Sequence, residues 1–319
     1  MSPPLLMDML ICPQCKSEDL NYTERTSADS ESYICGKCGA RYLVADSRPI
    51  LFAKSNALFT EDDYVGSQKV EHCPSRLESF IPQASTNMSV QDILGDMKKR
   101  LDACSAIIVV VGGGRQRIWL DPLLNGGGRH KMIYCDVDKW ADIDVFCDAH
   151  DLPFRNASVD AVVTTAVLEH VMYPEKAAAE IARVMKTGAL LYSELPFMQQ
   201  VHEGAYDFTR YTMSGHRRLF SHFAEIDSGL VSGPATALYW SIENFALSWF
   251  ENETPRKLVK AVLRTALFWL KYLDYPLRSK AGSLDAASCT YFYGRKAEAI
   301  VTDTQIIAGY KGSKAISHV

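Results

Sequence analysis

Short apolar segments alternate with helical or polar segments from residue 106 onward. Each of these segments carries hydrophobic side chains at most of its positions. Strands that are apolar throughout and are separated by helices are typical of a parallel sheet covered on both faces. The predicted fold class is therefore α/β, with strands at residues 106–111, 132–135, 143–146, 159–164 and 189–193.

Helical periodicity is clearest before the first of these strands. Residues 89–101 place their apolar side chains on one helical face, and Ser89 is expected to cap the start of the helix. We expect this helix to pack on the edge of the sheet. The other predicted elements are a helix at 175–187, a short helix at 214–222, and an antiparallel closing hairpin of 223–233 and 288–295 with an insertion at 234–286.

A glycine-rich turn follows the first predicted strand. Residues 112–114 are all glycine, and a helical segment comes next. Glycines at this place let backbone N–H groups and a helix N-terminus approach a ligand at the carboxyl end of the strand. The second strand ends in Asp136, an acid placed to bond the ribose hydroxyls of an adenosine-type ligand, with Asp138 as a close alternative.

The blocks after these residues complete a recognisable order. Residues 148–154 read DAHDLPF, residues 159–171 read VDAVVTTAVLEHV, and residues 180–188 read EIARVMKTG. Together with the glycine loop and Asp136, these motifs resemble the class I S-adenosylmethionine-dependent methyltransferases, specifically the type 11 group, over residues 106–233. The resemblance implies a doubly wound, Rossmann-like sheet of seven strands and a methyltransferase that uses S-adenosylmethionine.

The resemblance also implies where the cofactor would lie. Gly112 and Gly114 would approach its methionine part, with Gly113 in the same loop, and Asp136 would hold its ribose. The remaining implied contacts are Asp148 and Ala149 at the adenine edge, and Thr165 and Ala166 on the floor of the pocket.

Two positions depart from the type 11 pattern. Val110 stands where the family usually carries an acid, and Gln116 stands where it often carries a third glycine. That acid normally positions the amino group of the cofactor, so its replacement implies weaker binding or another way of holding the group. A dinucleotide-binding dehydrogenase has similar glycines, but the blocks at Asp148 and at residues 168–171 are not expected there.

Cysteine is unevenly distributed, because four of the nine cysteines lie within the first 38 residues. They form two CxxC pairs, and this spacing aims four thiolates at one tetrahedral zinc ion. A closed site of this kind is structural, and the metal would stabilise a module whose own core is small. Two redox-active pairs are the alternative, but these need a βαβ context that residues 1–52 lack. The predicted zinc ligands are Cys12, Cys15, Cys35 and Cys38.

The second pair begins the sequence CGKCGARYLVADSRPILF, which runs to residue 52. Residues 5–53 resemble the zinc-ribbon domains of the Trm112-like family. In that family, the second knuckle is followed by a strand, a turn and another short strand.

A polar and aromatic loop at residues 194–212 follows the fifth strand, at the sheet edge where an acceptor would lie. Methyl transfer from a sulfonium is an in-line displacement, and an acceptor hydroxyl needs a base for its proton. We predict His202 as that base and Arg210 as a clamp for an anionic or carbohydrate group, with Asp207 beside them. The alternative is that His202 packs the loop while Asp207 pairs with Arg210.

The same loop suggests a class of acceptor. Similar PF…H…D…R stretches occur in methyltransferases found among enzymes of cell-surface polysaccharides, which favours a small-molecule, sugar or lipid-linked glycan acceptor. Outside the loop, His170 and His216 are expected to serve packing or to contact solvent.

Charge separates the competing functions. The chain has 319 residues and a net charge of −4, which argues against a surface built to grip nucleic acid. The second hypothesis is therefore methylation of rRNA guanine. One family of such enzymes also joins a Cys-rich zinc module to this catalytic fold. A third hypothesis is a degenerate cofactor-binding or partner-docking module without catalysis, because Val110 replaces the usual acid.

The expected location is cytoplasmic, because the N-terminus lacks the basic region of a secretory signal. Residues 258–273 predict an amphipathic helix with a basic flank, which can lie on an anionic membrane surface; packing against the core is the alternative. The predicted organisation is a zinc ribbon at 1–53, a linker at 54–88, a methyltransferase domain at 89–300 with a helical insertion at 234–286, and a C-terminal tail at 301–319.

Overall fold

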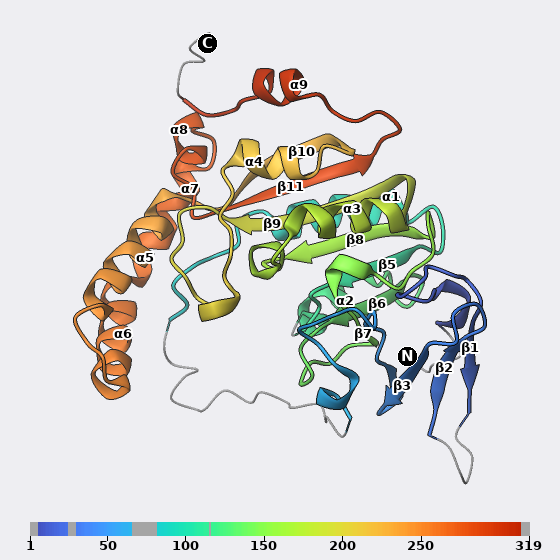
Figure 1. Ribbon diagram of the computed structural model, residues 1–319. Coiled ribbons are helices and arrows are strands. Elements are labelled where there is room, and N and C mark those ends of the chain that lie inside the picture. The colour runs from blue at the N-terminus through green and yellow to red at the C-terminus, as the bar shows by residue number, and fades with distance from the viewer. Residues whose placement is uncertain (1–5, 25–29, 66–81, 115, 314–319) are drawn as a thin grey trace.

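The computed structural model describes residues 6–24, 30–65, 82–114 and 116–313. Its centre is a seven-stranded sheet with five neighbouring parallel strands, and β11 runs antiparallel to both of its neighbours (Figure 1). This arrangement confirms the predicted α/β class and the Rossmann-like sheet. In spatial order the strands are β10 (Phe223–Ser232), β11 (Cys289–Lys296), β9 (Met185–Pro196), β8 (Val159–Thr165), β5 (Ile107–Val111), β6 (Lys131–Asp136) and β7 (Val145–Phe146).

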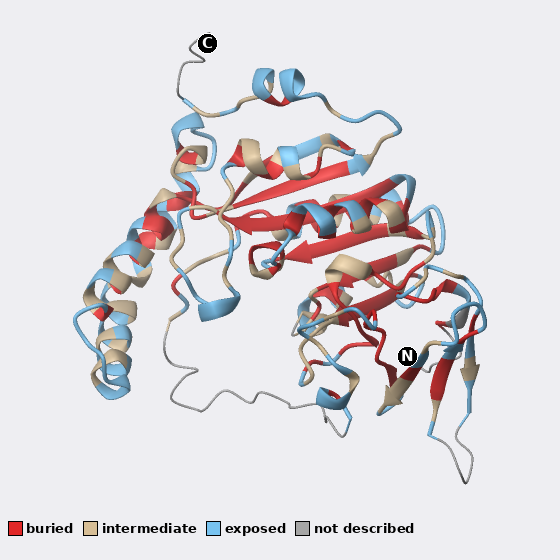
Figure 2. Ribbon diagram, in the orientation of Figure 1, coloured by how far each residue is buried: buried red, intermediate tan, exposed pale blue. Residues whose placement is uncertain are grey.

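Helices cover both faces of this sheet, and its central strands are buried (Figure 2). One face packs against α1 (Val90–Leu101) and α2 (Arg117–Leu124), which share a core with Ile108. The other face packs against α3 (Pro174–Val184), whose core includes Val109. Successive residues of β5 therefore enter opposite apolar layers, which explains why the strand sequences are apolar throughout.

The first helix differs in two ways from the expectation. α1 packs on a face of the sheet, where Leu94 is fully buried, and not on the edge. Its start is capped by Asn87, whose Oδ1 accepts the N–H groups of Ser89 at 3.1 Å and Val90 at 3.0 Å. The Ser89 hydroxyl instead donates to the carbonyl oxygen of Leu230 at 2.6 Å, so this serine joins the helix to β10.

The third helix is shorter than predicted because the following strand begins early. α3 ends at Val184, and Met185 already pairs with Val159 of β8. The strand then bulges before Leu190, and Gly188 in the bulge has a φ of +82°. The lysine–threonine–glycine sequence resembles a helix end, but its glycine serves the bulge instead.

Two further helices flank the closing strands in the sequence, one before β10 and one after β11. The predicted helix at 214–222 is α4 (Met213–Leu219), which ends before β10 begins. The predicted C-terminal tail contains α9 (Asp303–Ala308). Arg217 of α4 donates to the carbonyl oxygens of Ile306 at 3.2 Å and Gly309 at 2.6 Å, which fastens α9 to the domain.

The cysteine-rich segment forms its own small antiparallel sheet. The strands lie in sequence order, and a 3₁₀ turn, η2 (Met7–Met9), precedes them. The strands are β1 (Leu20–Thr23), β2 (Ser32–Cys35), β3 (Arg41–Ala45) and β4 (Arg48–Pro49).

This N-terminal module packs against the β7 edge of the main sheet. Ile50 bridges Phe146 of β7 in parallel, and the N–H of Leu51 donates to the carbonyl oxygen of Phe146 at 2.8 Å. Leu10 forms an antiparallel bridge with Phe154. The module thereby supplies hydrogen-bond partners to an edge strand that would otherwise expose its backbone groups.

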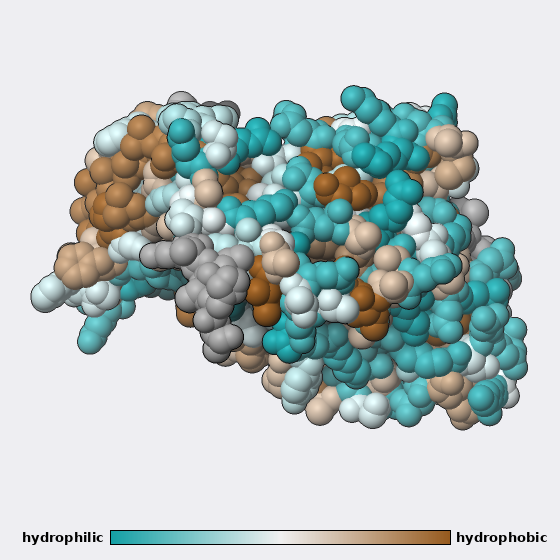
Figure 3. All heavy atoms as spheres, turned by 90° about the horizontal axis from the view of Figure 1, so that it is seen from above, coloured by the Kyte–Doolittle hydropathy of each residue, from teal (hydrophilic) through white to brown (hydrophobic). Residues whose placement is uncertain are grey.

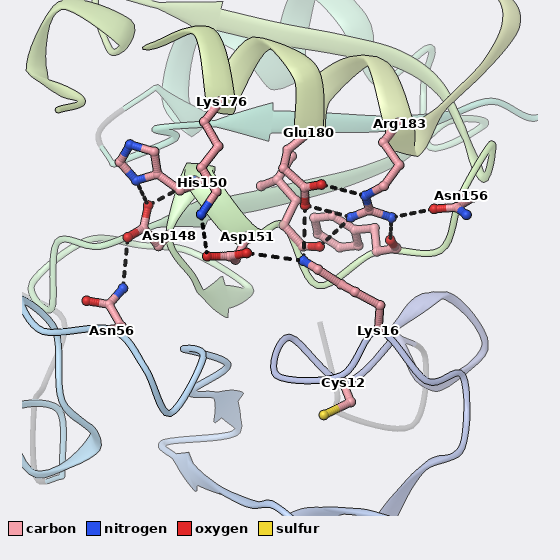
Figure 4. A network of polar contacts seen from close by, with 12 residues as sticks. Cys12, Lys16, Asn56, Asp148, His150, Asp151, Asn156, Lys176, Glu180 and Arg183 are labelled. Atoms are coloured by element: carbon pink, nitrogen blue, oxygen red, sulfur yellow. Dashed lines mark hydrogen bonds and ion pairs between the residues drawn. The ribbon is translucent and has the colours of Figure 1, made fainter. Parts of the chain in front are cut away.

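Charged side chains also join the module to α3 (Figure 4). The Nζ of Lys16 lies 3.2 Å from a carboxylate oxygen of Glu180 and 3.5 Å from one of Asp151. Arg183 binds Glu180 in turn and donates to the carbonyl oxygen of Phe154 at 2.8 Å. Ion pairs this close to solvent add little free energy of folding. We therefore expect these contacts to orient the module rather than to stabilise it.

The residues between β10 and β11 form a set of helices that extends away from the sheet (Figure 1). The buried Asp274 accepts hydrogen bonds from the N–H groups of Gly233, Ala235 and Thr236, so it anchors the start of α5. Among the described residues, none of the helices is long and apolar enough to cross a membrane. The helices are α5 (Pro234–Leu247), α6 (Glu253–Leu267), η8 (Phe268–Leu273), α7 (Asp274–Leu277) and α8 (Ala281–Leu284).

Two predicted segments are covered only in part. Residues 66–81 of the predicted linker and residues 314–319 of the predicted tail lie outside the described residues. The described start of the linker contains a 3₁₀ turn, η3 (Glu61–Asp63), and packs on the main domain through Tyr64, whose ring centroid lies 4.9 Å from that of Phe146.

The buried His216 predicts a pH dependence of stability. Its ring nitrogens lie 3.1 Å from the hydroxyls of Thr290 and Ser193, and burial lowers its pKa to about 3. Below its ordinary pKa of about 6.5, the unfolded chain binds a proton that the folded chain does not, so stability falls as the pH falls. Between pH 6 and 5, His216 should account for a loss of about 1 kcal/mol.

Urea unfolding of the wild-type protein and of His216→Gln measures this effect. The glutamine amide can still bond both hydroxyls but does not titrate, so the variant should lose less stability across the same interval. Equal losses in the two proteins would contradict the assignment.

Candidate functional site

The glycine loop lies at the carboxyl ends of β5 and β6. The N–H groups of Gly112 and Gly113 both donate to the carbonyl oxygen of Cys135, and Gly112 has a φ of +71°. A Cβ at Gly112 would lie 2.2 Å from the side chain of Val167, and one at Gly113 would lie 2.8 Å from a ring carbon of Tyr134. The loop therefore requires glycine for its own packing, and this packing keeps its backbone close to the strand ends.

Asp136 is tied directly to this loop. Its carboxylate accepts the N–H of Gly114 at 2.8 Å, and also those of Val137 and Asp138. Burial raises its pKa, although these three N–H groups act in the opposite direction. Asp138, the alternative from the sequence, instead accepts the N–H of Trp140 at 2.9 Å. Of the two acids, Asp136 is the one that contacts the glycine loop.

Asp148 and Ala149 follow β7 on the same edge, and Ala149 begins the 3₁₀ turn η5 (Ala149–Asp151). The Asp148 carboxylate accepts the amide of Asn56 at 2.8 Å and the backbone N–H of His150 at 2.9 Å, and the His150 ring lies beside it (Figure 4). Burial raises the pKa of Asp148, but the hydrogen bonds from His150 outweigh it and leave the pKa below its usual value.

A segment outside the predicted catalytic domain therefore contacts the carboxyl ends of β6 and β7. Asn56 belongs to the predicted linker, as does Tyr64, whose hydroxyl donates to the carbonyl oxygen of Val137 at 2.6 Å. Val137 directly follows Asp136, so the linker touches both strand ends that the resemblance assigns to the nucleoside.

Gln116 connects the ends of β5 and β8. Its Nε2 donates to the carbonyl oxygens of Gly112 at 3.3 Å and Thr165 at 3.1 Å. Its Oε1 is buried and has no hydrogen-bond partner among the described residues. Val110 is fully buried in the sheet, while Ala166 is exposed with a φ of +54°. The unsatisfied acceptor of Gln116 thus lies beside the glycine loop, which follows the strand that contains Val110.

The loop after β9 surrounds a cavity of about 550 Å³, lined by residues 199–201 and 207–210 and by Asn244 of α5. Arg210 is the centre of this loop. Its guanidinium binds the Asp207 carboxylate and donates to the carbonyl oxygens of Gln199, Gln200 and Thr209. These bonds use all five N–H donors of the arginine. The structure thus has the pairing of Asp207 with Arg210 that the packing alternative describes.

His202 lies at the exposed end of the same loop. Its backbone N–H donates to Asp207 at 2.9 Å, and its Nδ1 lies 3.3 Å from the carbonyl oxygen of Gln200. Arg210 holds the pKa of Asp207 well below its usual range, so this carboxyl stays ionised. The three residues predicted as catalytic therefore form one connected group.

Glu169 is a further candidate that the sequence analysis did not name. It lies in the 3₁₀ turn η6 (Leu168–His170) after β8, and its carbonyl oxygen accepts the N–H groups of Phe208 and Thr209. Its side chain is fully buried, and neither carboxylate oxygen has a hydrogen-bond partner among the described residues. Burial raises its pKa to about 8. The only sign in the sequence is its place directly after a strand, in the motif AVLEHV.

The four N-terminal cysteines converge on one point. The sulfur atoms of Cys12 and Cys38 are 3.7 Å apart, and those of Cys15 and Cys35 are 3.6 Å apart. Four sulfurs around one zinc ion would be about 3.8 Å apart, given a bond of about 2.3 Å. Burial raises the pKa of the Cys35 thiol, but hydrogen bonds from the backbone N–H groups of Cys38 and Lys37 outweigh burial. The net effect lowers this pKa to about 7. The donor set is compatible with zinc.

The sequence matches a known family over the segment that forms part of the sheet's carboxyl edge. Residues 130–193 match the family described as a methyltransferase domain. The matched segment runs from β6 into β9 and contains Asp136, Asp148 and Thr165. The match and the seven-stranded sheet together support a methyltransferase domain of the class I type. No curated protein matches this sequence significantly.

Solved structures resemble this domain only distantly. The Haemonchus contortus phosphoethanolamine N-methyltransferase 2 is 16% identical, with 67% of this chain and 54% of that chain covered and a TM-score of 0.40. The Burkholderia thailandensis 1,6-didemethyltoxoflavin-N1-methyltransferase is 12% identical, with 66% and 79% covered and a TM-score of 0.38. The [4+2]-cyclase SpnF is 16% identical, with 65% and 80% covered and a TM-score of 0.39.

The cysteine cluster generates a prediction for the methyltransferase domain and its module. If the four cysteines bind one zinc ion, Cys38→Ser removes one of its ligands, so the purified variant should contain about one zinc less per chain and unfold at a lower temperature. Cys104→Ser is the matched control, because Cys104 is also exposed but lies outside the cluster.

Zinc released by a thiol-reactive probe and thermal unfolding of both variants provide the measurement. Zinc content that is unchanged in Cys38→Ser would show that the four cysteines do not form a metal site.

Proposed function

We propose that this chain transfers a methyl group from S-adenosylmethionine to an acceptor in the cavity of residues 199–210. One observation carries the proposal. The segment that matches the methyltransferase family supplies the strand ends at which Asp136, Asp148 and Thr165 lie. The cavity adjoins the same edge, because the N–H groups of Phe208 and Thr209 bond the turn that follows β8.

The residues of this edge fit S-adenosylmethionine. The glycines at 112–114 would adjoin its methionine part, Asp136 its ribose, and Asp148 with Ala149 its adenine, while Thr165 and Ala166 would form the floor. The unpartnered Oε1 of Gln116 can accept from an ammonium group, which offers a replacement for the acid that Val110 displaces. When bound, the cofactor supplies a methyl group on a sulfonium, and the sulfur keeps the bonding electron pair as the acceptor atom attacks.

On the acceptor side, the residues take separate parts. His202 is our candidate to receive the acceptor proton, because its ring lies near the cavity and is partly exposed. Arg210 and Asp207 are positioning residues: the arginine uses its donors within the loop, and the pair shapes the wall of the cavity. Holding the acceptor in line with the methyl group is the main catalytic task in such a transfer.

We further propose that residues 1–53 are a Trm112-like zinc ribbon with a structural zinc ion. The four sulfur atoms support this assignment by their number and spacing. The module covers the β7 edge and leads through Leu51 to Asn56, so its metal would help to hold the adenine edge in place.

The acceptor that we propose is amphiphilic, such as a lipid-linked sugar, and is reached at a membrane surface. Hydrophobic side chains gather on the side of the molecule where the helical insertion lies (Figure 3). Phe245 and Trp249 are 68% and 75% exposed, and Phe245 is adjacent in sequence to Asn244 of the cavity wall. Exposed apolar surface of this kind marks a partner or a membrane.

Two of the three basic residues of the predicted amphipathic helix have partners within the protein, whereas Lys260 is exposed. Arg264 lies 3.5 Å from the buried Glu243, and Lys271 donates to the carbonyl oxygen of Gln83. Apolar burial, rather than attraction to anionic lipid, should therefore drive the membrane contact.

Calorimetry with S-adenosylmethionine tests the central proposal. The wild-type protein should bind it, and Asp136→Asn should weaken binding at least tenfold, because both carboxylate oxygens accept backbone N–H groups and the amide NH2 would face one of these donors in either orientation. Asp138→Asn is the matched control and should bind like the wild type. Absence of binding at millimolar cofactor would refute the proposed function.

Flotation with phosphatidylcholine vesicles tests the surface contact. Replacing Phe245 and Trp249 by alanine should reduce the bound fraction severalfold. Ile307→Ala is the control and should leave it unchanged, because Ile307 is also apolar and exposed but lies on α9, outside the insertion. Adding phosphatidylserine should have little effect on the wild type. Equal binding of all three proteins would contradict the membrane proposal.

A further inference from the structure

Glu169 presents an unusual buried polar group behind the proposed acceptor cavity, because its backbone carbonyl oxygen accepts the N–H groups of the lining residues Phe208 and Thr209. Its side chain is fully buried, and both of its carboxylate oxygens lack a hydrogen-bond partner among the described residues. The nearby guanidinium of Arg210 does not satisfy them, because its five N–H donors bond Asp207 and the loop carbonyls. A buried carboxylate without a partner is costly unless something absent from the protein itself binds it.

Two histidines flank this carboxylate. The Nε2 of His170 lies 3.7 Å from the Oε1 of Glu169, and the ring centroids of His170 and His202 are 4.7 Å apart. One ligand atom from each of the three residues lies within 4.8 Å of the others. Ligand atoms about 2.1 Å from a shared ion would lie about 3 to 4 Å apart, so a small closure would complete the site.

The other nitrogen of each ring is already held by the protein. The Nδ1 of His170 lies 2.8 Å from the carbonyl oxygen of Tyr206, and that of His202 lies 3.3 Å from the carbonyl oxygen of Gln200. Donation from Nδ1 to a carbonyl fixes the tautomer and leaves Nε2 as the lone-pair donor, which is the usual arrangement around histidine ligands. Both carbonyls belong to the loop that forms the cavity wall.

We propose that Glu169, His170 and His202 bind a divalent cation at the acceptor cavity. Two imidazoles and one carboxylate suit manganese, iron, cobalt or zinc and leave coordination positions open. The inference rests on the proposed function and deepens it: a cation here would bind an acceptor through oxygen atoms, such as paired hydroxyls or a phosphate, and would favour the deprotonated hydroxyl. His202 would then be a metal ligand, the cation would lower the pKa of the acceptor hydroxyl, and the hydroxyl proton would pass to solvent water.

Manganese is the probe that separates this site from the cysteine cluster, because it prefers oxygen and nitrogen ligands to thiolates. Electron paramagnetic resonance of the full chain during titration with Mn²⁺ should show one bound ion per chain. His202→Gln, on the exposed loop, should weaken binding tenfold or more, and Glu169→Gln should do the same. His222→Gln is the matched control, since this exposed histidine lies outside the cluster and should have no effect.

Titration of the same samples with S-adenosylmethionine keeps the two proposals apart. Cofactor binding by His202→Gln at wild-type affinity would show that the variant is folded. If the wild type binds cofactor but no Mn²⁺ at millimolar concentration, the metal site is refuted and the proposed function stands. Equal Mn²⁺ affinity in the wild type and His202→Gln would also refute the site, whereas absence of cofactor binding alone would refute the proposed function.

Discussion

The outer edge of β7 needs hydrogen-bond partners, and much of the candidate site depends on how it obtains them. Ile50 and Leu51 pair with Phe146, so the chain leaves the cysteine module directly along the main sheet. Further along the same stretch, the side-chain amide of Asn56 donates to Asp148, and the Tyr64 hydroxyl donates to the carbonyl oxygen of Val137. One continuous stretch thus joins the cysteine cluster to the carboxyl edge of the main sheet, and it contacts that edge at Asp148 and Val137.

The sequence predicted the main sheet well where local patterns are decisive. The strands at 106–111 and 159–164 are apolar on both faces, and only a sheet covered by helices on both sides accommodates that composition. The glycine loop and Asp136 were also predictable, because a strand end followed by glycines leaves few arrangements open. Where two local patterns competed, the prediction failed: Gly188 resembles a helix terminator, but pairing of Met185 with Val159 ends α3 earlier.

The rest of the site depends on contacts between residues far apart in the sequence. Asn56 and Asp148 are 92 residues apart, and no periodicity in either segment indicates their contact. The same holds for Glu169, whose neighbours Phe208 and Thr209 come from the loop after the next strand. The sequence predicted Arg210 as a clamp for an acceptor, but it could not show that the loop's own carbonyl oxygens bond its donors.

Buried acceptors without partners distinguish the two sides of this edge. Within the part of the chain that the structure describes, Gln116 leaves one oxygen unsatisfied beside the glycine loop, and Glu169 leaves two beside the cavity of residues 199–210. Each such group costs about 1–3 kcal/mol if nothing binds it. Both side chains lie next to the ends of β5 and β8, where a class I fold places its ligands. Both carboxylate oxygens of Asp136, in contrast, accept backbone N–H groups. The Asp136 carboxylate therefore holds the loop in shape, and the unsatisfied oxygens of Gln116 and Glu169 are further positions at which ligands can add free energy of binding.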